Sequence, residues 1–311
     1  MIPNTKFMTS LIETLVETGL GLSSAKLYVS KLAMLNDRKG YNNLDFLKKK
    51  TEIDERISNT TENIHSRKSA YTAIVSILSK TGSDKTKKLL EYYRAKLVEI
   101  VETVKLIPAN TKTQKQDDNW MPFEEVMDVY NKLEAKVKAQ KPDSKNMTDM
   151  NLFTDWVLLS MYVLQSPRRN LDNILVIGDA KTKANETVAS NFYNPKTGLL
   201  TYRVYKTAKV TGEEEFTAND ALKTVLKTNI KKFGLVDGDN LLRTSTGDAI
   251  KTSSQISKKL QSIFKPLNIS SSMLRHIYIT HMFGDTLTKQ QEVAKAMGHS
   301  VDMQQDYILK D

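Results

Sequence analysis

The feature that most constrains the fold is a change in hydrophobic periodicity in the middle of the chain. Before about residue 165, apolar residues recur at the three- and four-residue spacing of amphipathic helices, as in Met8, Leu11 and Leu15. Residues 173–217 instead contain short apolar runs, some alternating with polar residues, with turn sequences between them. Helical spacing returns after Ala218. The pattern predicts a mainly α-helical protein with one small β-sheet, which we expect to be antiparallel.

Caps, breakers and apolar periodicity also place individual elements within this pattern. We expect the longer helices at residues 63–78, 85–106, 123–139 and 149–164. We expect strands at residues 173–178, 199–205 and 214–217, with a turn at 191–198. A chain of 311 residues is long enough for two domains.

A polar segment, residues 108–119, separates the first helices from the rest of the chain. It has few apolar residues, which is typical of an exposed connector between domains. We therefore expect a helical domain at residues 1–110, a linker at 111–119 and a second domain at 120–311.

The net charge and the absence of cysteine limit the classes of partner and of functional site that the chain can have. The chain has 46 basic and 36 acidic residues, a net charge of +10, and both parts are basic: residues 1–119 carry +6 and residues 120–311 carry +4. This balance favours a polyanionic partner over a neutral metabolite. With no cysteine, the chain has no disulfides, no thiol nucleophile and no cysteine-containing zinc site.

No segment resembles a signal peptide or a membrane span. Glu13 and Glu17 interrupt the first apolar stretch, and the longest apolar run, residues 152–164, is too short for a bilayer and contains Asp155. We expect a soluble intracellular protein without a membrane partner.

Residues suited to phosphoryl-transfer chemistry gather near the end of the chain. A helical run carries Ser272, Arg275 and His276, a Gly-His-Ser turn carries His299, and Tyr307 follows eight residues later. Three of the four histidines lie in the last 36 residues. This clustering predicts that the chemistry is located in the second domain.

Two upstream motifs complete this set. Arg168 and Arg169 lie shortly before Asp172, an acidic residue. Lys206-Thr207 lies in the predicted sheet. Lys209 and Lys196 in the same region compete with Lys206, which we favour because its Lys-Thr pair ends a strand before a turn.

In this order, the motifs resemble those of the tyrosine recombinase (phage-type integrase) family, most clearly over residues 120–311. The resemblance implies a helical core-binding domain that clamps DNA, followed by an α+β catalytic domain. It implies Tyr307 as the nucleophile, Arg169, Arg275 and His299 as phosphate-binding residues, and Lys206, on a β-hairpin, as the acid for the leaving oxygen. In the family's first arginine motif an acidic residue follows the arginine three positions later, which selects Arg169, paired with Asp172, over Arg168. His276 is expected to pack behind Arg275.

The residue types suit this chemistry independently of the resemblance. Attack on a phosphodiester builds negative charge on the non-bridging oxygens, and two guanidiniums that cannot deprotonate would neutralise it. A tyrosine hydroxyl with an ordinary pKa of about 10 needs nearby positive charge to ionise. The sequence contains no clustered carboxylate or histidine ligand set, so we expect neither a metal nor a cofactor.

Two departures from the family pattern concern the C-terminal motif. The family's first histidine is replaced by Ser272, which cannot hold a proton near neutral pH. Tyr307 follows His299 by eight residues, one fewer than the commonest family interval. His281 and His65 are expected to be surface or structural histidines.

These features favour a site-specific DNA recombinase that acts on double-stranded DNA as a homo-tetramer, without a small-molecule substrate. A lysine- and asparagine-rich recombinase suits a virus or another mobile element, and it would then act in the cytoplasm or nucleus of the host cell. Two alternatives stay open: a type IB topoisomerase, and a DNA-binding protein that has lost catalysis.

Overall fold

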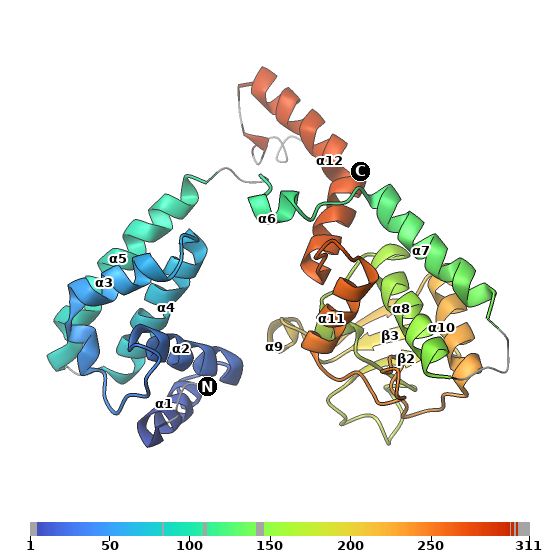
Figure 1. Cartoon of the computed structure of the whole chain (residues 1–311), viewed down its shortest axis with the longest axis horizontal. Coiled ribbons are helices and arrows are strands. Elements are labelled where there is room, and N and C mark those ends of the chain that lie inside the picture. The colour runs from blue at the N-terminus through green and yellow to red at the C-terminus, as the bar shows by residue number, and fades with distance from the viewer. Residues whose placement is uncertain are drawn as a thin grey trace. The chain divides into compact units, whose positions relative to one another are not determined.

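The computed structural model describes residues 5–82, 84–107, 111–140, 146–298, 300, 301 and 303. The chain divides into two compact units, Met1–Thr111 and Lys112–Asp311, each with its own hydrophobic core. Most of the described chain is helical, with one small sheet in the second unit (Figure 1). The mainly helical class predicted from the sequence is confirmed at this level.

The described elements of the first unit are all helices. They are α1 (Lys6–Glu17), α2 (Leu22–Leu35), the 3₁₀ helix η1 (Asp45–Lys48), α3 (Lys50–Thr60), α4 (Ile64–Thr81), the 3₁₀ helix η2 (Asp84–Thr86) and α5 (Lys87–Lys105). The two longer helices expected in this part of the chain correspond to α4 and α5.

Buried polar contacts fix the helices of the first unit around its apolar core. Asp54 on α3 accepts hydrogen bonds from the hydroxyls of Tyr71 on α4, at 2.9 Å, and Tyr92 on α5. The Tyr93 hydroxyl, also on α5, donates to the carbonyl of Leu47 at 2.7 Å. These hydroxyls satisfy the polar ends of rings whose bodies fill the core.

The second unit combines helices with the sheet. Its elements are α6 (Gln114–Asp117), α7 (Phe123–Lys138), α8 (Met147–Val163), the 3₁₀ helix η3 (Asn170–Asn173), β1 (Leu175–Ile177), β2 (Asn191–Asn194), β3 (Leu199–Tyr202), α9 (Ala208–Thr211), β4 (Glu214–Thr217), α10 (Asp220–Phe233), α11 (Ser253–Ile263) and α12 (Ser271–Ala296).

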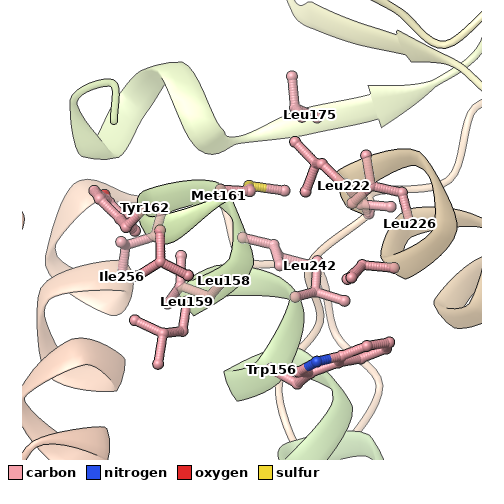
Figure 2. Packing of buried hydrophobic residues seen from close by; sticks show 14 of the residues in the cluster. Trp156, Leu158, Leu159, Met161, Tyr162, Leu175, Leu222, Leu226, Leu242 and Ile256 are labelled. Carbon is pink, nitrogen blue, oxygen red and sulfur yellow. The ribbon is translucent and has the colours of Figure 1, made fainter. Parts of the chain in front are cut away.

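Helix α8 is the centre of the second core. Most of its side chains are buried, and α7, α10, α11 and α12 pack against it. Figure 2 shows Leu158, Leu159 and Met161 of α8 among apolar side chains of the sheet and neighbouring helices. A partly buried ion pair between α8 and α11 joins Asp155 and Lys259 at 2.9 Å. A helix with apolar residues on nearly all sides is buried because it lacks a polar face that could be exposed to water.

The sheet has the strand order β1-β2-β3-β4 and is mixed, not antiparallel as expected. β1 and β2 are parallel, while β2–β3 and β3–β4 are antiparallel. The reason is the connection between β1 and β2: residues 178–190 form a crossover, which parallel neighbours need and a hairpin cannot supply.

Three further expectations differ from the structure. The turn expected at residues 191–198 begins with strand β2, and only the rest of it forms the turn to β3. The strand expected to reach residue 205 ends at Tyr202, and α9 follows before β4. The predicted linker contains α6, and the Asn119 side chain accepts a hydrogen bond from the backbone N–H of Asn268 at 2.6 Å. Part of this segment is therefore attached to the second unit. None of the helices in the described ranges is long and apolar enough to cross a bilayer.

Candidate functional site

The sheet brings two of the predicted motifs to one end. β1 and β2 run in parallel from Leu175 and Asn191, and β3 ends where β4 begins, with Tyr202 paired to Glu214. η3 leads into β1, and Lys206 follows the end of β3. Both motifs therefore lie at the same end of the sheet, which we call the η3 end.

Asn191, the first residue of β2, ties these two motifs together. Its Nδ2 donates to the carbonyls of Leu171 at 3.2 Å and Val204 at 3.0 Å. Its Oδ1 accepts from the backbone N–H groups of Arg203 at 2.9 Å and Val204 at 2.7 Å. These side-chain bonds to Arg203 and Val204 take the place of strand pairing after β3, which ends at Tyr202. The side chain fixes the segment before Lys206 relative to η3.

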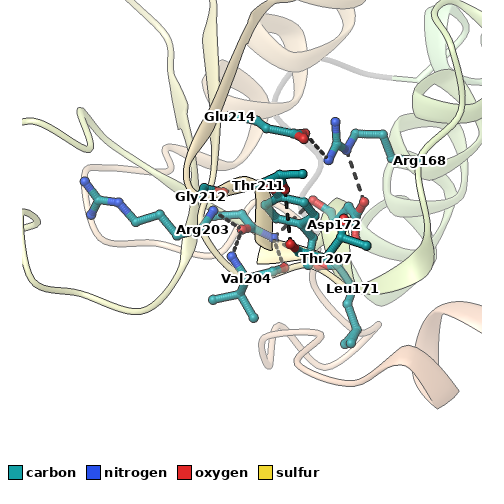
Figure 3. A network of polar contacts seen from close by, with 11 residues as sticks. Arg168, Leu171, Asp172, Arg203, Val204, Thr207, Thr211, Gly212 and Glu214 are labelled. Atoms are coloured by element: carbon teal, nitrogen blue, oxygen red, sulfur yellow. Dashed lines mark hydrogen bonds and ion pairs between the residues drawn. The ribbon is translucent and has the colours of Figure 1, made fainter. Parts of the chain in front are cut away.

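Arg168 is a structural arginine at the η3 end. Its Nε donates to Asp172 Oδ2 at 3.1 Å and its Nη2 to Glu214 Oε2 at 2.9 Å (Figure 3). The guanidinium also lies 4.0 Å from the centroid of the Tyr202 ring. Burial lowers the pKa of Arg168, but hydrogen bonds to the two carboxylates outweigh it and raise the pKa overall. Two nitrogens and one face of this guanidinium are therefore engaged within the protein.

The predicted pairing of Arg169 with Asp172 is therefore wrong, because Arg168 occupies the carboxylate. Arg169 is the extended N-cap residue of η3, with φ −74° and ψ 162°, so the helical spacing to Asp172 does not hold. Its side chain is exposed and has no hydrogen bond or ion pair with any described residue. Arg169 is consequently free to bind an external anion.

The acidic strand beside these arginines is neutralised internally. Residues 213–215 are three consecutive glutamates, which pair in order with Arg203, Arg168 and Lys181. The Lys181 pair measures 3.1 Å. Each glutamate has a cationic partner, although Arg168 is shared between Glu214 and Asp172, so these glutamates repel a bound polyanion less than their number suggests.

The structure separates the three competing lysines. Lys206 and Lys209 lie in the β3–β4 connection at the η3 end, whereas Lys196 lies in the β2–β3 turn at the opposite end. The connection is closed by the Tyr205 hydroxyl, which donates to the carbonyl of Gly212 at 2.6 Å. Lys206 and Lys209 are exposed and have no partner among the described residues. This placement excludes Lys196 from the η3 end.

The third motif begins helix α12. Ser270 caps the helix by accepting from the backbone N–H of Met273 at 3.3 Å, and Ser272 is exposed in the first turn. Arg275 is half-buried. His276 is exposed and makes no hydrogen bond or ion pair with described residues, so it does not pack behind Arg275 as expected. The reason is that consecutive helix residues point in different directions.

Helix α8 contacts both η3, through Tyr162, and α12. Tyr162 is 1% exposed, and its hydroxyl donates to Asn170 Oδ1 at 2.9 Å. Burial raises the pKa of Tyr162, and the Asp172 carboxylate raises it further, while the Ser271 side chain and the positive charge of Arg275 lower it. Residues more than 100 positions apart in sequence therefore share one electrostatic environment.

Two histidines from the sequence analysis lie elsewhere. The His281 ring stacks on Phe123, with centroids 4.6 Å apart, and its Nδ1 lies 3.1 Å from Glu124 Oε1. His65 is in the first turn of α4, where its backbone N–H is capped by Asn63. His299 and Tyr307 lie outside the described residues, so their predicted roles rest on sequence.

The chain has no detectable relative in three comparisons: no protein-family model, curated protein or solved structure matches it. Among the described residues, no group of three or more histidines and acidic residues is placed to hold a metal ion. The geometry of the η3 end and the start of α12 is therefore the basis for assigning a function.

Sequence reasoning missed the residues that hold this site together. Tyr162 reads as part of an apolar helix, and Asn170 and Asn191 read as loop residues. A signal for Asn191 was available, because it directly precedes apolar residues of a strand and is therefore expected to be buried. A buried asparagine needs hydrogen-bond partners within the protein, which marks it as structurally important. For Tyr162 and Asn170, contacts between segments far apart in sequence decide the role.

Proposed function

We propose that this protein is a tyrosine-type site-specific DNA recombinase that breaks and rejoins duplex DNA through a covalent 3′-phosphotyrosyl intermediate. The observation that carries the proposal is that α8 contacts both arginine motifs: its Tyr162 binds Asn170, which follows Arg169, and α12, which carries Arg275, packs against it. Arg169 of one motif is exposed and unengaged among the described residues, and Arg275 of the other is half-buried.

The two guanidiniums account for binding of the scissile phosphate. Attack at phosphorus gives a pentavalent transition state with extra negative charge on the non-bridging oxygens. Arg169 and Arg275 would each donate several N–H bonds to those oxygens while staying charged. Ser272, exposed one turn before Arg275, would add a hydroxyl donor where the family has a histidine.

The remaining steps use Tyr307, Lys206 and His299. The Tyr307 oxygen attacks the phosphorus, the bond to the 5′ oxygen breaks, and the DNA 3′ end stays attached to the tyrosine. Lys206 would give its proton to the departing 5′ oxygen, for which its exposed place in the β3–β4 connection is suited. His299 would donate a hydrogen bond to the phosphate. Attack by a 5′ hydroxyl then reverses these steps and reseals the strand.

Double-stranded DNA is the proposed partner, gripped by both units. The net charge of +10 is shared by the two parts of the chain, as expected for binding to a phosphate backbone. The first unit would be the helical core-binding domain and the second the catalytic domain. Recombination would require a homo-tetramer on two paired sites, inside a cell, with no small-molecule substrate.

The test is a suicide substrate, a duplex with a nick next to the cleavage site, so that the freed oligonucleotide diffuses away and traps the intermediate. Because the site is unknown, a library of nicked duplexes from the protein's own genetic neighbourhood is used. Wild type should form a denaturation-resistant DNA adduct, and Tyr307→Phe should form none. Equal adduct from both proteins, or none from wild type, contradicts the proposal.

The same preparation separates the two alternatives that the sequence left open. Relaxation of supercoiled plasmid without site preference would indicate a type IB topoisomerase. Tight binding to one duplex, with no adduct from any member of the library, would indicate a DNA-binding protein that has lost catalysis.

A further inference from the structure

The core of the second unit contains one polar connection that links three of its helical segments. Tyr162 lies near the end of α8, close to Ile256 of α11 and otherwise among apolar side chains (Figure 2). A buried tyrosine hydroxyl needs a hydrogen-bond partner, and here it donates to Asn170 Oδ1 at 2.9 Å. Asn170 belongs to η3 and is 7% exposed.

Both ends of the Asn170 amide make hydrogen bonds. Oδ1 accepts from Tyr162, while the two N–H bonds of Nδ2 are shared among three acceptors: the hydroxyl of Ser257 at 2.9 Å, and the carbonyl and hydroxyl of Ser253, both at 3.1 Å. Both serines belong to α11. The amide therefore ties α8, η3 and α11 together, and a buried network with every member satisfied is rigid.

Because Asn170 is next to Arg169 in the chain, its hydrogen bonds also affect the position of Arg169. Asn170 directly follows Arg169 and precedes Asp172 by two residues, so fixing its amide fixes the backbone from which the Arg169 side chain extends. On the other side, Tyr162 belongs to α8, and α12, which carries Arg275, packs against α8. The connection thus determines where one arginine lies relative to the other.

We propose that Tyr162 and Asn170 are positioning residues that hold Arg169 and Arg275 at the separation needed to bind one phosphate. The inference rests on the proposed function, because it assigns the arginines to a common phosphate. Neither Tyr162 nor Asn170 touches the DNA. Their contribution is geometric: two guanidiniums stabilise a transition state only if both reach its oxygens at once.

The central variant is Tyr162→Phe, which removes the hydroxyl and keeps the ring in the core. A matched control is Tyr193→Phe. Tyr193 is a fully buried tyrosine of β2 in the same unit, and its hydroxyl has no hydrogen-bond partner. Both variants lose one buried oxygen, but only Tyr162→Phe breaks the connection to η3.

The measurement is single-turnover adduct formation on the nicked duplex at saturating protein, together with the dissociation constant for the same duplex. Tyr162→Phe should form adduct about 10- to 100-fold more slowly, the range expected for a displacement of catalytic groups on the order of 1 Å. Its dissociation constant should equal that of wild type, because the contacts to the rest of the duplex are intact. Tyr193→Phe should match wild type in both quantities.

Two further variants separate positioning from loss of folding. Ser257→Ala removes one of the acceptors of Asn170 Nδ2 at a half-buried place, and its rate should fall between those of wild type and Tyr162→Phe. Asn170→Ala combined with Tyr162→Phe should be no slower than Asn170→Ala alone, because both act through one hydrogen bond.

The outcomes distinguish this inference from the proposed function. If wild type and Tyr193→Phe form adduct and Tyr162→Phe forms it equally fast, the positioning role is overturned while the function stands. If Tyr162→Phe loses DNA affinity in proportion to its rate, the hydroxyl supports the fold in general and the positioning role is again overturned. If wild type forms no adduct, both proposals are overturned.

Discussion

Substituting the two adjacent arginines of the first motif should have opposite consequences. Arg168→Met removes the cation from Asp172, whose side chain is 3% exposed and whose Oδ1 already has no partner among the described residues. Arg169→Met removes an exposed side chain without a partner among the described residues. The first variant should therefore be unstable, and the second should be stable but inactive.

The magnitudes follow from the burial of the charges left behind. Removing one partner of a buried ion pair costs about 3–5 kcal/mol. The Arg168 side chain is 21% exposed, so water screens the pair partly and the lower end, about 3 kcal/mol, is expected. An exposed side chain without a partner changes the free energy of unfolding by less than about 0.5 kcal/mol. Loss of a transition-state donor, by contrast, lowers the cleavage rate about 100- to 1000-fold.

Urea unfolding followed by tryptophan fluorescence measures the stability difference. Both tryptophans, Trp120 and Trp156, belong to the second unit, so the signal reports the unit that carries both arginines. Adduct formation below the unfolding transition measures activity. If Arg169→Met lowers the free energy of unfolding as much as Arg168→Met, then Arg169 is the partner of Asp172 and the assignment of the two arginines is refuted.

Three other predictions concern the lysines, an acidic residue and salt. Lys206→Met should slow adduct formation strongly, whereas the control Lys196→Met should not. In a duplex whose 5′-bridging oxygen is replaced by sulfur, the leaving thiolate needs no proton, so this duplex should restore the rate of Lys206→Met. Failure of that rescue contradicts the acid role. Burial raises the pKa of Asp155, although the positive charge of Lys259 opposes this shift. The free energy of unfolding of wild type relative to Asp155→Asn should therefore be highest below about pH 4, the ordinary pKa of an aspartate. It should fall as pH rises through the raised pKa of Asp155. Titration by urea unfolding from pH 3 to 8 checks this. The logarithm of the DNA-binding constant should fall linearly with the logarithm of the salt concentration. A binding constant that does not change with salt argues against phosphate contacts.

The sequence was most informative where periodicity is strong. The long helices α4, α5, α7 and α8 lie close to their predicted bounds, and β4 matches its prediction, because apolar spacing and caps are local properties. The relative direction of neighbouring strands could not be predicted in this way, because it does not depend on local sequence. The β1–β2 pair is parallel because of where the crossover 178–190 returns, and no residue in either strand specifies that.

Within the candidate site, sequence spacing found the segments but not the roles of their residues. The assignment of Asp172 to Arg169 rested on the spacing of the family's first arginine motif, whereas in the structure Asp172 pairs with Arg168. Lys196 could be set aside only with the strand register, which places it at the opposite end of the sheet from Lys206. Residues that position others, such as Asn191, have no spacing rule because their partners are set by tertiary contacts.

The most direct test of the central claim is the chemical identity of the trapped intermediate. Trypsin would cleave after Lys295 and Lys310, and the resulting peptide, residues 296–310, contains Tyr307 as its single tyrosine. After nuclease trimming, fragmentation mass spectrometry should find a nucleotide 3′-phosphate esterified to Tyr307. A nucleotide on Ser300 of the same peptide, on a tyrosine of another peptide, or attached through a 5′-phosphate would contradict the proposed chemistry.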